Sequence, residues 1–287
     1  MALSNPALNQ QKFQTAIDEE QPGWAAGGNA TAAGTTTVAP GTGLRPPQGE
    51  VAGKVMTYGG TFSATLVLFV LLLAGGWFGW QGVTQTPGVA DATGKITYSI
   101  NLPSWLFIVA IAAFGLAIVT IFKPRIAMFT GPIYAVAEGA VLGAISAMYN
   151  LQFNGIVLQA VLATLSVFGV MLFLYATRLI RVTKRFRMII IGAMMGIIVM
   201  YLLTFVATLF GANVAFWDQP TPLGIGISVL IVGVASFNLM LNFDMIEAAV
   251  VAKAPRYMEW YGAFGLMIAL VWLYLEILRL LALLNRR

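Results

Sequence analysis

GIGISVLIVGVASFNLMLNFDMIEAAVV at residues 224–251 and WYGAFGLMIALVWLYLEILRLLALL at residues 260–284 are the two stretches that decide the fold. Each is longer than the roughly 20 apolar residues that a helix needs to cross about 30 Å of hydrocarbon. Both nevertheless carry ionisable side chains, Asp244 and Glu247 in the first and Glu276 and Arg279 in the second. A charge inside a membrane costs free energy, so such residues usually face a bundle interior or a water-filled cavity. These residues are therefore the first candidates for function.

The composition of the whole chain places it in a membrane. Of its 287 residues, 59% are hydrophobic and only 9% are charged, whereas soluble domains carry about 25% charged residues. The net charge of +5 does not indicate nucleic-acid binding, because the basic residues cluster in short turns between apolar segments. The chain has no Cys and no His, which excludes thiol chemistry, a Ser-His protease and a zinc protease. We expect an integral membrane protein that is not an enzyme and needs no cofactor.

Residues 1–54 differ in composition from the rest of the chain. They are rich in Ala, Gly, Thr, Pro, Asn and Gln. Such a segment cannot bury enough apolar surface to offset the entropy lost on ordering. No basic start is followed by an apolar run, so the segment does not resemble a secretory signal. The sequence predicts a disordered cytoplasmic tail at residues 1–54 and a transmembrane domain at residues 55–287.

Seven apolar segments follow the tail, and each is expected to form one helix of an all-α transmembrane bundle. They lie near residues 61–82, 104–122, 130–148, 155–177, 188–210, 223–250 and 260–284. The polar connection at residues 82–103 is expected to form a hairpin. Gly75-x-x-x-Gly79 and Gly192-x-x-x-Gly196 have the spacing at which small residues let two transmembrane helices pack closely.

The basic residues of the connections predict the orientation in the membrane. Three alternate connections hold nine basic residues, whereas the opposite connections hold only Lys95. Loops rich in Lys and Arg face the cytoplasm, so we expect a multi-pass protein of the cell membrane with a cytoplasmic N-terminus and an outer C-terminus. Tryptophans at positions 77, 80, 105 and 217 lie at the opposite ends of the spans, where amphipathic rings prefer to sit. The nine basic residues are Lys123, Arg125, Arg178, Arg181, Lys184, Arg185, Arg187, Lys253 and Arg256.

Besides Glu247, which lies one turn nearer the cytoplasm than Asp244, three acids lie inside the predicted spans at different depths. At 1.5 Å per residue, Glu138 lies about 12 Å and Asp244 about 9 Å from the cytoplasmic ends of their spans, so these two could face each other. Glu276 lies about 24 Å from that side, beyond the midplane. Arg279 follows Glu276 at the i,i+3 spacing at which opposite charges neutralise each other. Each acid also has a purely structural interpretation: an ion pair for Glu276, a buried hydrogen bond for Glu138 and capping of a helix end for Asp244.

The three acids lie in three longer sequence motifs. These are Leu239-Met-Leu-Asn-Phe-Asp244-Met-Ile, Trp272-Leu-Tyr-Leu-Glu276-Ile-Leu-Arg-Leu-Leu and Pro132-Ile-Tyr-Ala-Val-Ala-Glu138-Gly-Ala-Val-Leu-Gly. They resemble motifs of the Bax inhibitor family, the transmembrane Bax inhibitor motif proteins. The resemblance is greatest to the actinobacterial branch and covers about residues 55–287. It implies a seven-helix bundle in which the last helix is central.

The resemblance also implies a function and a site. Bacterial members are implicated in a pH-sensitive calcium leak, and two acids on the last two spans form a proton-sensitive pair, which by motif position are Asp244 and Glu276. A basic residue near the end of the second span accompanies the pair in some members, which makes Lys123 and Arg125 candidates here. The second acid is Asp in the better-known pattern and Glu in this chain, and the interval between the two acids is longer. Glu138 is therefore an alternative partner of Asp244.

Together these observations predict a multi-pass membrane protein that mediates a pH-sensitive passive leak of cations, chiefly calcium. Calcium prefers carboxylate and carbonyl oxygens, so Asp244 and Glu276 are the candidate metal contacts. Two nearby acids in a medium of low dielectric share one proton and titrate as a unit. Arg279, Lys123 and Arg125 are the candidate counter-charges, and the expected partners are the lipid bilayer, calcium ions and protons. The alternatives are a proton-coupled transporter and a non-transporting regulator of membrane protein quality control.

Overall fold

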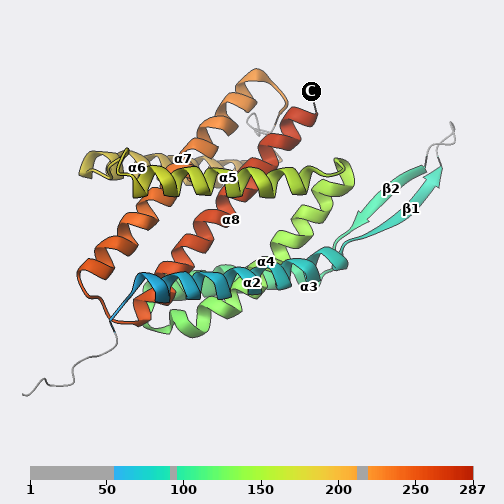
Figure 1. Ribbon diagram of the computed structural model, residues 1–287. Helices are drawn as coiled ribbons and strands as arrows, with labels where there is room; N and C mark the ends of the chain where they lie inside the picture. Colours follow the sequence, from blue (N-terminus) through green and yellow to red (C-terminus); the bar gives the residue numbers. More distant parts are fainter. Residues whose placement is uncertain (1–54, 91–95, 212–218, 287) are drawn as a thin grey trace, which may run out of the picture. The chain divides into compact units, whose positions relative to one another are not determined.

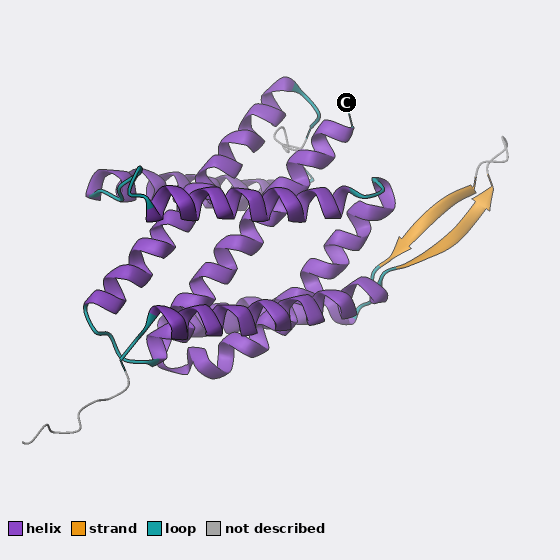
Figure 2. Ribbon diagram, viewed as in Figure 1, coloured by secondary structure: helices purple, strands orange, loops and turns teal. Residues whose placement is uncertain are grey.

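The computed structural model describes residues 55–90, 96–211 and 219–286, which are almost entirely helical (Figure 1, Figure 2). The predicted tail at residues 1–54 and the tryptophan at position 217 lie outside these residues. In chain order the elements are α2 (Tyr58–Gly82), β1 (Thr84–Ala90), β2 (Ile96–Asn101), α3 (Trp105–Phe122), the 3-10 turn η2 (Pro124–Ile126), α4 (Ala127–Gln152), α5 (Ile156–Ala176), α6 (Lys184–Leu209), α7 (Pro222–Val251) and α8 (Tyr257–Asn285).

Seven of these helices are long and apolar enough to cross a membrane, which confirms the seven predicted spans. Four of them, α2, α4, α6 and α8, begin about one turn earlier than the apolar segments suggest. In α2 and α6 a threonine caps this first turn. The hydroxyl of Thr57 accepts a hydrogen bond from the Gly60 amide, and that of Thr183 accepts one from the Phe186 amide. Each cap satisfies an amide that would otherwise lack a partner at the start of its helix.

The connection between α2 and α3 forms the expected hairpin. Strands β1 and β2 pair antiparallel, with Thr84 opposite Asn101, and the register shifts between Pro87 and Ala90. We call this side of the helices the hairpin end. The opposite end carries the connections with the nine basic residues, and we call it the basic end.

Helix α8 lies at the centre of the bundle, as the family resemblance implies. It packs against α2, α4, α5, α7 and η2. In the most apolar 18-residue stretch of α8, 67% is buried, whereas the figure is 11% in both α3 and α6. Figure 1 shows α2 and α3 together on one side of the bundle and α5 and α6 together on the other, with α4, α7 and α8 crossing between these pairs. Helix α6 packs mainly against α7, so it is among the least embedded spans.

Helices α2 and α4 approach each other so closely that their backbones touch. A Cβ atom added to Gly79 would lie 1.9 Å from the carbonyl oxygen of Ala140, which confirms the predicted role of the Gly75-x-x-x-Gly79 pair. Gly139 and Gly143 of α4 likewise face the backbone of α2. A Cβ atom on Gly143 would lie 1.9 Å from the carbonyl oxygen of Gly76. This second pair has the same spacing in the sequence but is not among the predicted pairs.

The prediction for Gly192-x-x-x-Gly196 is wrong. A Cβ atom at either position would have nothing within 4 Å. Both glycines lie on α6, and neither is buried in the structure. The spacing therefore permits close packing but does not itself supply a partner helix.

Candidate functional site

The deepest charged group of the bundle is centred on Glu276 of α8. Its neighbour at i,i+3, Arg279, places Nη2 2.9 Å from Glu276 Oε2. The hydroxyl of Tyr201, on α6, donates a hydrogen bond of 2.7 Å to Glu276 Oε1 and accepts one from Arg279 Nη1. Trp272 Nε1 donates to the same Oε1 at 3.2 Å, and Arg279 Nη2 donates to Ser228 Oγ of α7 at 3.4 Å. The cluster therefore joins α6, α7 and α8.

Burial makes this cluster costly to break. The side chains of Glu276 and Arg279 are only 6% and 15% exposed. A buried charge is tolerated when it is paired and hydrogen-bonded, and removing one partner is strongly destabilising. Glu276 Oε2 and Arg279 Nε nevertheless have no hydrogen-bond partner among the described residues, so the contact at Oε2 is an ion pair without hydrogen-bond geometry. The expected pairing of Glu276 with Arg279 is present.

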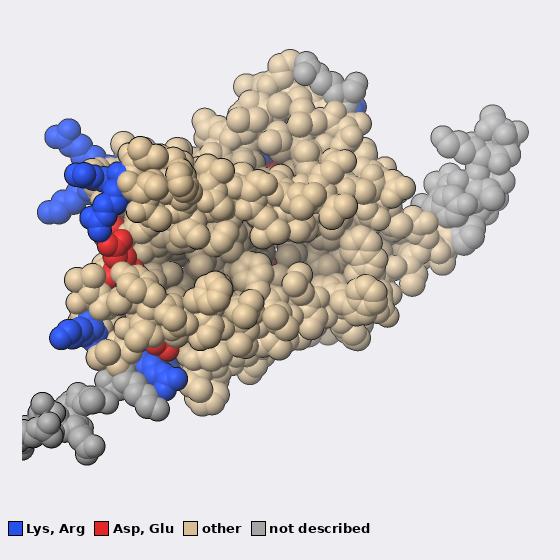
Figure 3. Space-filling model, viewed as in Figure 1, with Lys and Arg blue, Asp and Glu red and all other residues tan. Residues whose placement is uncertain are grey.

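Asp244 lies near the basic end of α7 and forms an ion pair with Arg187, in the first turn of α6. Its side chain is 26% exposed and that of Arg187 is 55% exposed. One turn further along α7, Glu247 pairs with Arg178 at 3.2 Å and accepts a hydrogen bond from the hydroxyl of Tyr175. Figure 3 shows acidic side chains lying among the basic ones at this end of the bundle. One ion pair thus fastens the connection from α5 to α6 to α7, and the other fastens the start of α6 to α7.

Glu138 is half-buried on α4. Its carboxylate lies within electrostatic reach of the hydroxyl of Tyr134, one turn earlier on the same helix. The ring of Tyr134 packs edge-on against Phe264 of α8, with ring centroids 5.1 Å apart. Glu138 therefore belongs to the contact between α4 and α8, with a phenol as its partner.

The structure does not bring the three acids together. Each acid has its own partners: Arg187 for Asp244, the set of Tyr201, Arg279 and Trp272 for Glu276, and Tyr134 for Glu138. The described residues contain no contact of one of these acids with another. Along their helices Asp244 lies about 12 Å and Glu276 about 28 Å from the turn that joins α7 to α8. No three acidic side chains gather to hold a metal ion within the described part of the chain. A calcium site shared by Asp244 and Glu276 is therefore not formed in this arrangement.

The counter-charge of Asp244 is also a different residue from those expected. Lys123 and Arg125 lie at the end of α3 and in η2, and neither forms an ion pair in the described residues. Arg187 takes this role. The sequence offered no signal for it, because five basic residues lie between positions 178 and 187 and nothing local distinguishes one that meets α7.

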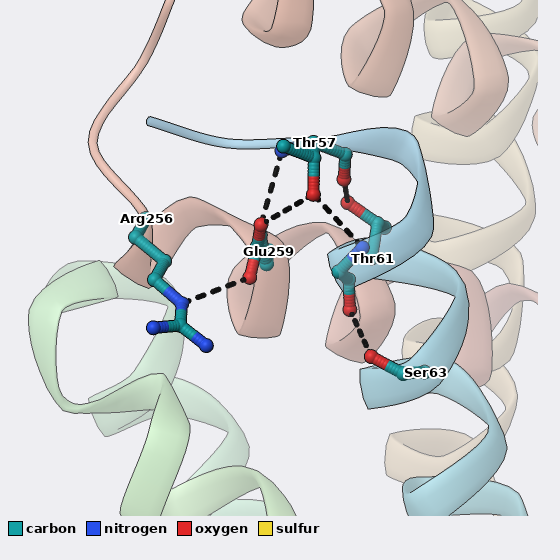
Figure 4. A network of polar contacts seen from close by, with 6 residues as sticks. Thr57, Thr61, Ser63, Arg256 and Glu259 are labelled. Carbon is teal, nitrogen blue, oxygen red and sulfur yellow. Dashed lines mark hydrogen bonds and ion pairs between the residues drawn. The ribbon is translucent and has the colours of Figure 1, made fainter. Parts of the chain in front are cut away.

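Sequence reasoning missed one buried acid altogether, Glu259 in the first turn of α8 (Figure 4). The residue is 5% exposed, and its Oε1 accepts hydrogen bonds from the amide and hydroxyl of Thr57, at 3.0 and 2.9 Å. Arg256 lies 3.6 Å from the other carboxylate oxygen. A Cβ atom on Gly60 would lie 2.1 Å from Glu259 Oε1, so only glycine leaves room for this contact. An acid at a helix N-terminus was a usable signal.

These features define a multi-pass, all-α membrane protein whose intramembrane acids are held by partners within the chain. The chain belongs to the Bax inhibitor 1 like family, whose model matches residues 5–286. The match begins well before residue 55, so the extent expected from the motifs alone was too short. No curated protein and no solved structure matches the chain.

Proposed function

We propose that this protein is a pH-sensitive passive leak for cations, chiefly calcium, in the cell membrane, with its N-terminus in the cytoplasm. In this proposal it is not an enzyme and uses no cofactor. The observation that supports it is the way α6 is held. One polar contact, Asp244 with Arg187, fastens the basic end of α6 to α7, and a second, Tyr201 with Glu276 and Arg279, fastens it to α8 deeper in the bundle.

This arrangement fits a closed state. Calcium takes six to eight oxygen ligands, so a path for it needs carboxylate oxygens that are free to coordinate. In this structure each carboxylate is already paired with an arginine: Asp244 with Arg187, Glu247 with Arg178 and Glu276 with Arg279. An opening movement of α6 would withdraw Arg187 and leave Asp244 available to a passing cation. Apolar packing holds α6 only weakly, because only Ile190 and Ile197 of this helix are buried.

The direction of the pH dependence follows from the ion pair. The charged or titratable groups around Asp244 are Arg187 from α6, Tyr175 from α5 and Glu247 on its own helix. Protonation of Asp244 removes the negative charge that holds Arg187, whereas deprotonation restores it. Acid therefore releases α6, and the leak increases as the pH falls.

The test is calcium flux into liposomes that hold the purified protein, measured across pH 5 to 8. We expect the wild-type flux to rise as the pH falls, and Asp244→Asn to give a high flux that no longer depends on pH. Arg187→Gln removes the other half of the ion pair and should give the same result. Arg185→Gln, two residues earlier on the same helix, is the matched control and should keep the wild-type profile.

Other outcomes would favour other functions. An Asp244→Asn variant with a wild-type pH profile would place the gate elsewhere, with Glu138 as the next acid to replace. Saturable flux of an organic substrate driven by a proton gradient would favour a proton-coupled transporter. Absence of any flux from folded protein would favour a non-transporting regulator.

A further inference from the structure

A cavity of about 580 Å³ lies between α2 and α5, with α4 and α8 behind it. Its rim consists of exposed apolar side chains, including Leu73 and Trp77 of α2 and Leu165 of α5. Its floor is buried and includes Ser146 of α4 and Tyr274 of α8. In Figure 3 the surface is hollowed between α5 and α2. Because all four helices are membrane-spanning candidates, this groove opens sideways towards lipid.

The hydroxyl groups that line the groove are already satisfied. Ser146 donates to the carbonyl oxygen of Leu142 at 2.7 Å, so the 2.7 Å contact between Ser146 and Tyr274 uses the proton of Tyr274. Thr164 donates to the carbonyl oxygen of Ala160 at 2.7 Å. A buried water needs two to four polar partners, and these hydroxyls have no proton left to offer one. The middle of the groove therefore suits hydrocarbon better than water or a polar solute.

The groove has a polar group at one end only. Trp77 and Trp80, in the last turns of α2, line it at the hairpin end. Indole rings prefer the level of the lipid headgroups, where the ring is apolar and the N–H is wet. An apolar slot that ends in two indoles matches an amphipathic molecule with its tail in the slot and its polar head beside the tryptophans. The cavity volume also falls within the range of about 300 to 1,000 Å³ that is typical of ligand sites.

We propose that this groove is a binding site for one acyl chain of a phospholipid from the leaflet at the hairpin end. The occupant is held by shape, because lipid tails in the bilayer are as apolar as the groove itself. The site is independent of the proposed ion path, since none of its lining residues is charged.

Photocrosslinking tests this site directly. The purified protein is placed in vesicles of phosphatidylcholine that contain a small share of phosphatidylcholine with a diazirine in mid-chain, and the crosslinked peptides are mapped by mass spectrometry. We expect adducts to concentrate on the groove residues of α4, α5 and α8, and to reach saturation as the share of probe rises. An even spread of adducts over all exposed apolar residues would show bulk lipid only and would overturn the proposal.

Filling variants provide the control. Val161→Trp places a large side chain at the rim of the groove, whereas Leu162→Trp places it on the exposed face next to the groove on the same helix. Val161→Trp should lower the groove adducts several-fold, and Leu162→Trp should leave them unchanged. Leu165→Trp is a second filling variant in case the first does not fold. Equal labelling of the groove in folded filling and control variants contradicts the proposal. Labelling of the groove that appears only after residues 1–54 are deleted also contradicts it, because those residues and not lipid would then cover the groove in the full chain.

Discussion

At the scale of single residues, Tyr201 holds together the deepest charges of the bundle. Its hydroxyl donates to Glu276 and accepts from Arg279, so it satisfies both members of a buried ion pair at once. The guanidinium carbon of Arg279 also lies 5.6 Å from the centre of the Tyr201 ring, a cation–π distance. This one side chain from α6 therefore contributes to the position of both charged residues on α8.

Replacing Tyr201 by Phe removes the hydroxyl and leaves the ring. Glu276 then loses a hydrogen bond inside the bundle, which we expect to lower the free energy of unfolding by about 1–2 kcal/mol. Thermal unfolding of the purified protein in detergent measures this change. Tyr58→Phe is the control, because the Tyr58 side chain is 55% exposed. Equal melting temperatures for the two variants would show that the hydroxyl contributes nothing to stability.

At the scale of elements, the contact of α2 with α4 depends on glycine in both helices. Gly75 and Gly79 of α2 face the backbone of α4, and Gly139 and Gly143 of α4 face the backbone of α2. Association of helices in lipid relies on close van der Waals packing, because the hydrophobic effect gives no preference for protein over lipid tails. These four glycines therefore stabilise the contact because they have no side chain to hold the two backbones apart.

Gly143→Ala should destabilise the protein, and Gly196→Ala should not. The added methyl group at position 143 would meet the carbonyl oxygen of Gly76, whereas at position 196 it enters open space. We expect a loss of about 1–3 kcal/mol for the first variant from overpacking. The second should gain up to about 1 kcal/mol, because alanine favours a helix over glycine. Chemical unfolding of both variants in the same detergent distinguishes them, and a neutral Gly143→Ala would refute the close contact.

At the scale of the whole molecule, the charges of the described residues gather mainly at one end of the bundle. Three of the four ion pairs lie at the basic end, and they use Asp244, Glu247 and Glu259. The hairpin end instead carries tryptophans of α2 and α3. This division is the pattern that the positive-inside rule associates with a cytoplasmic face and an outer face.

Introduced cysteines can test the orientation in the membrane, because the chain has no Cys of its own that would also react with a thiol reagent. Lys184→Cys lies at the basic end and should resist an impermeant thiol reagent in intact cells. Thr84→Cys, exposed at the start of β1, should react readily. Permeabilised cells, in which both should react, confirm that each thiol is accessible. The reverse labelling pattern in intact cells would invert the proposed topology.

The predictions that the structure confirms depend mainly on residues that lie close together in the sequence. The seven spans follow from runs of apolar residues, and the ion pair of Glu276 with Arg279 follows from their i,i+3 spacing on one helix. Both are local properties that a helix imposes whatever surrounds it. The central position of α8 came from the family resemblance, because its apolar pattern alone does not differ from that of a lipid-facing helix.

The sequence by itself determined that this chain has seven spans, that its basic connections share one end and that Asp244 and Glu276 lie within spans. Only the tertiary structure decided the partners: Arg187 for Asp244, Tyr201 for Glu276 and Thr57 for Glu259. Each of these contacts joins residues at least 57 positions apart. Which of several equivalent arginines or tyrosines meets an acid depends on how the helices are rotated and how deeply they are staggered. That rotation and stagger are set by packing between helices, as the unequal fates of Gly79 and Gly196 show, because the same local spacing produced contact in one case and open space in the other.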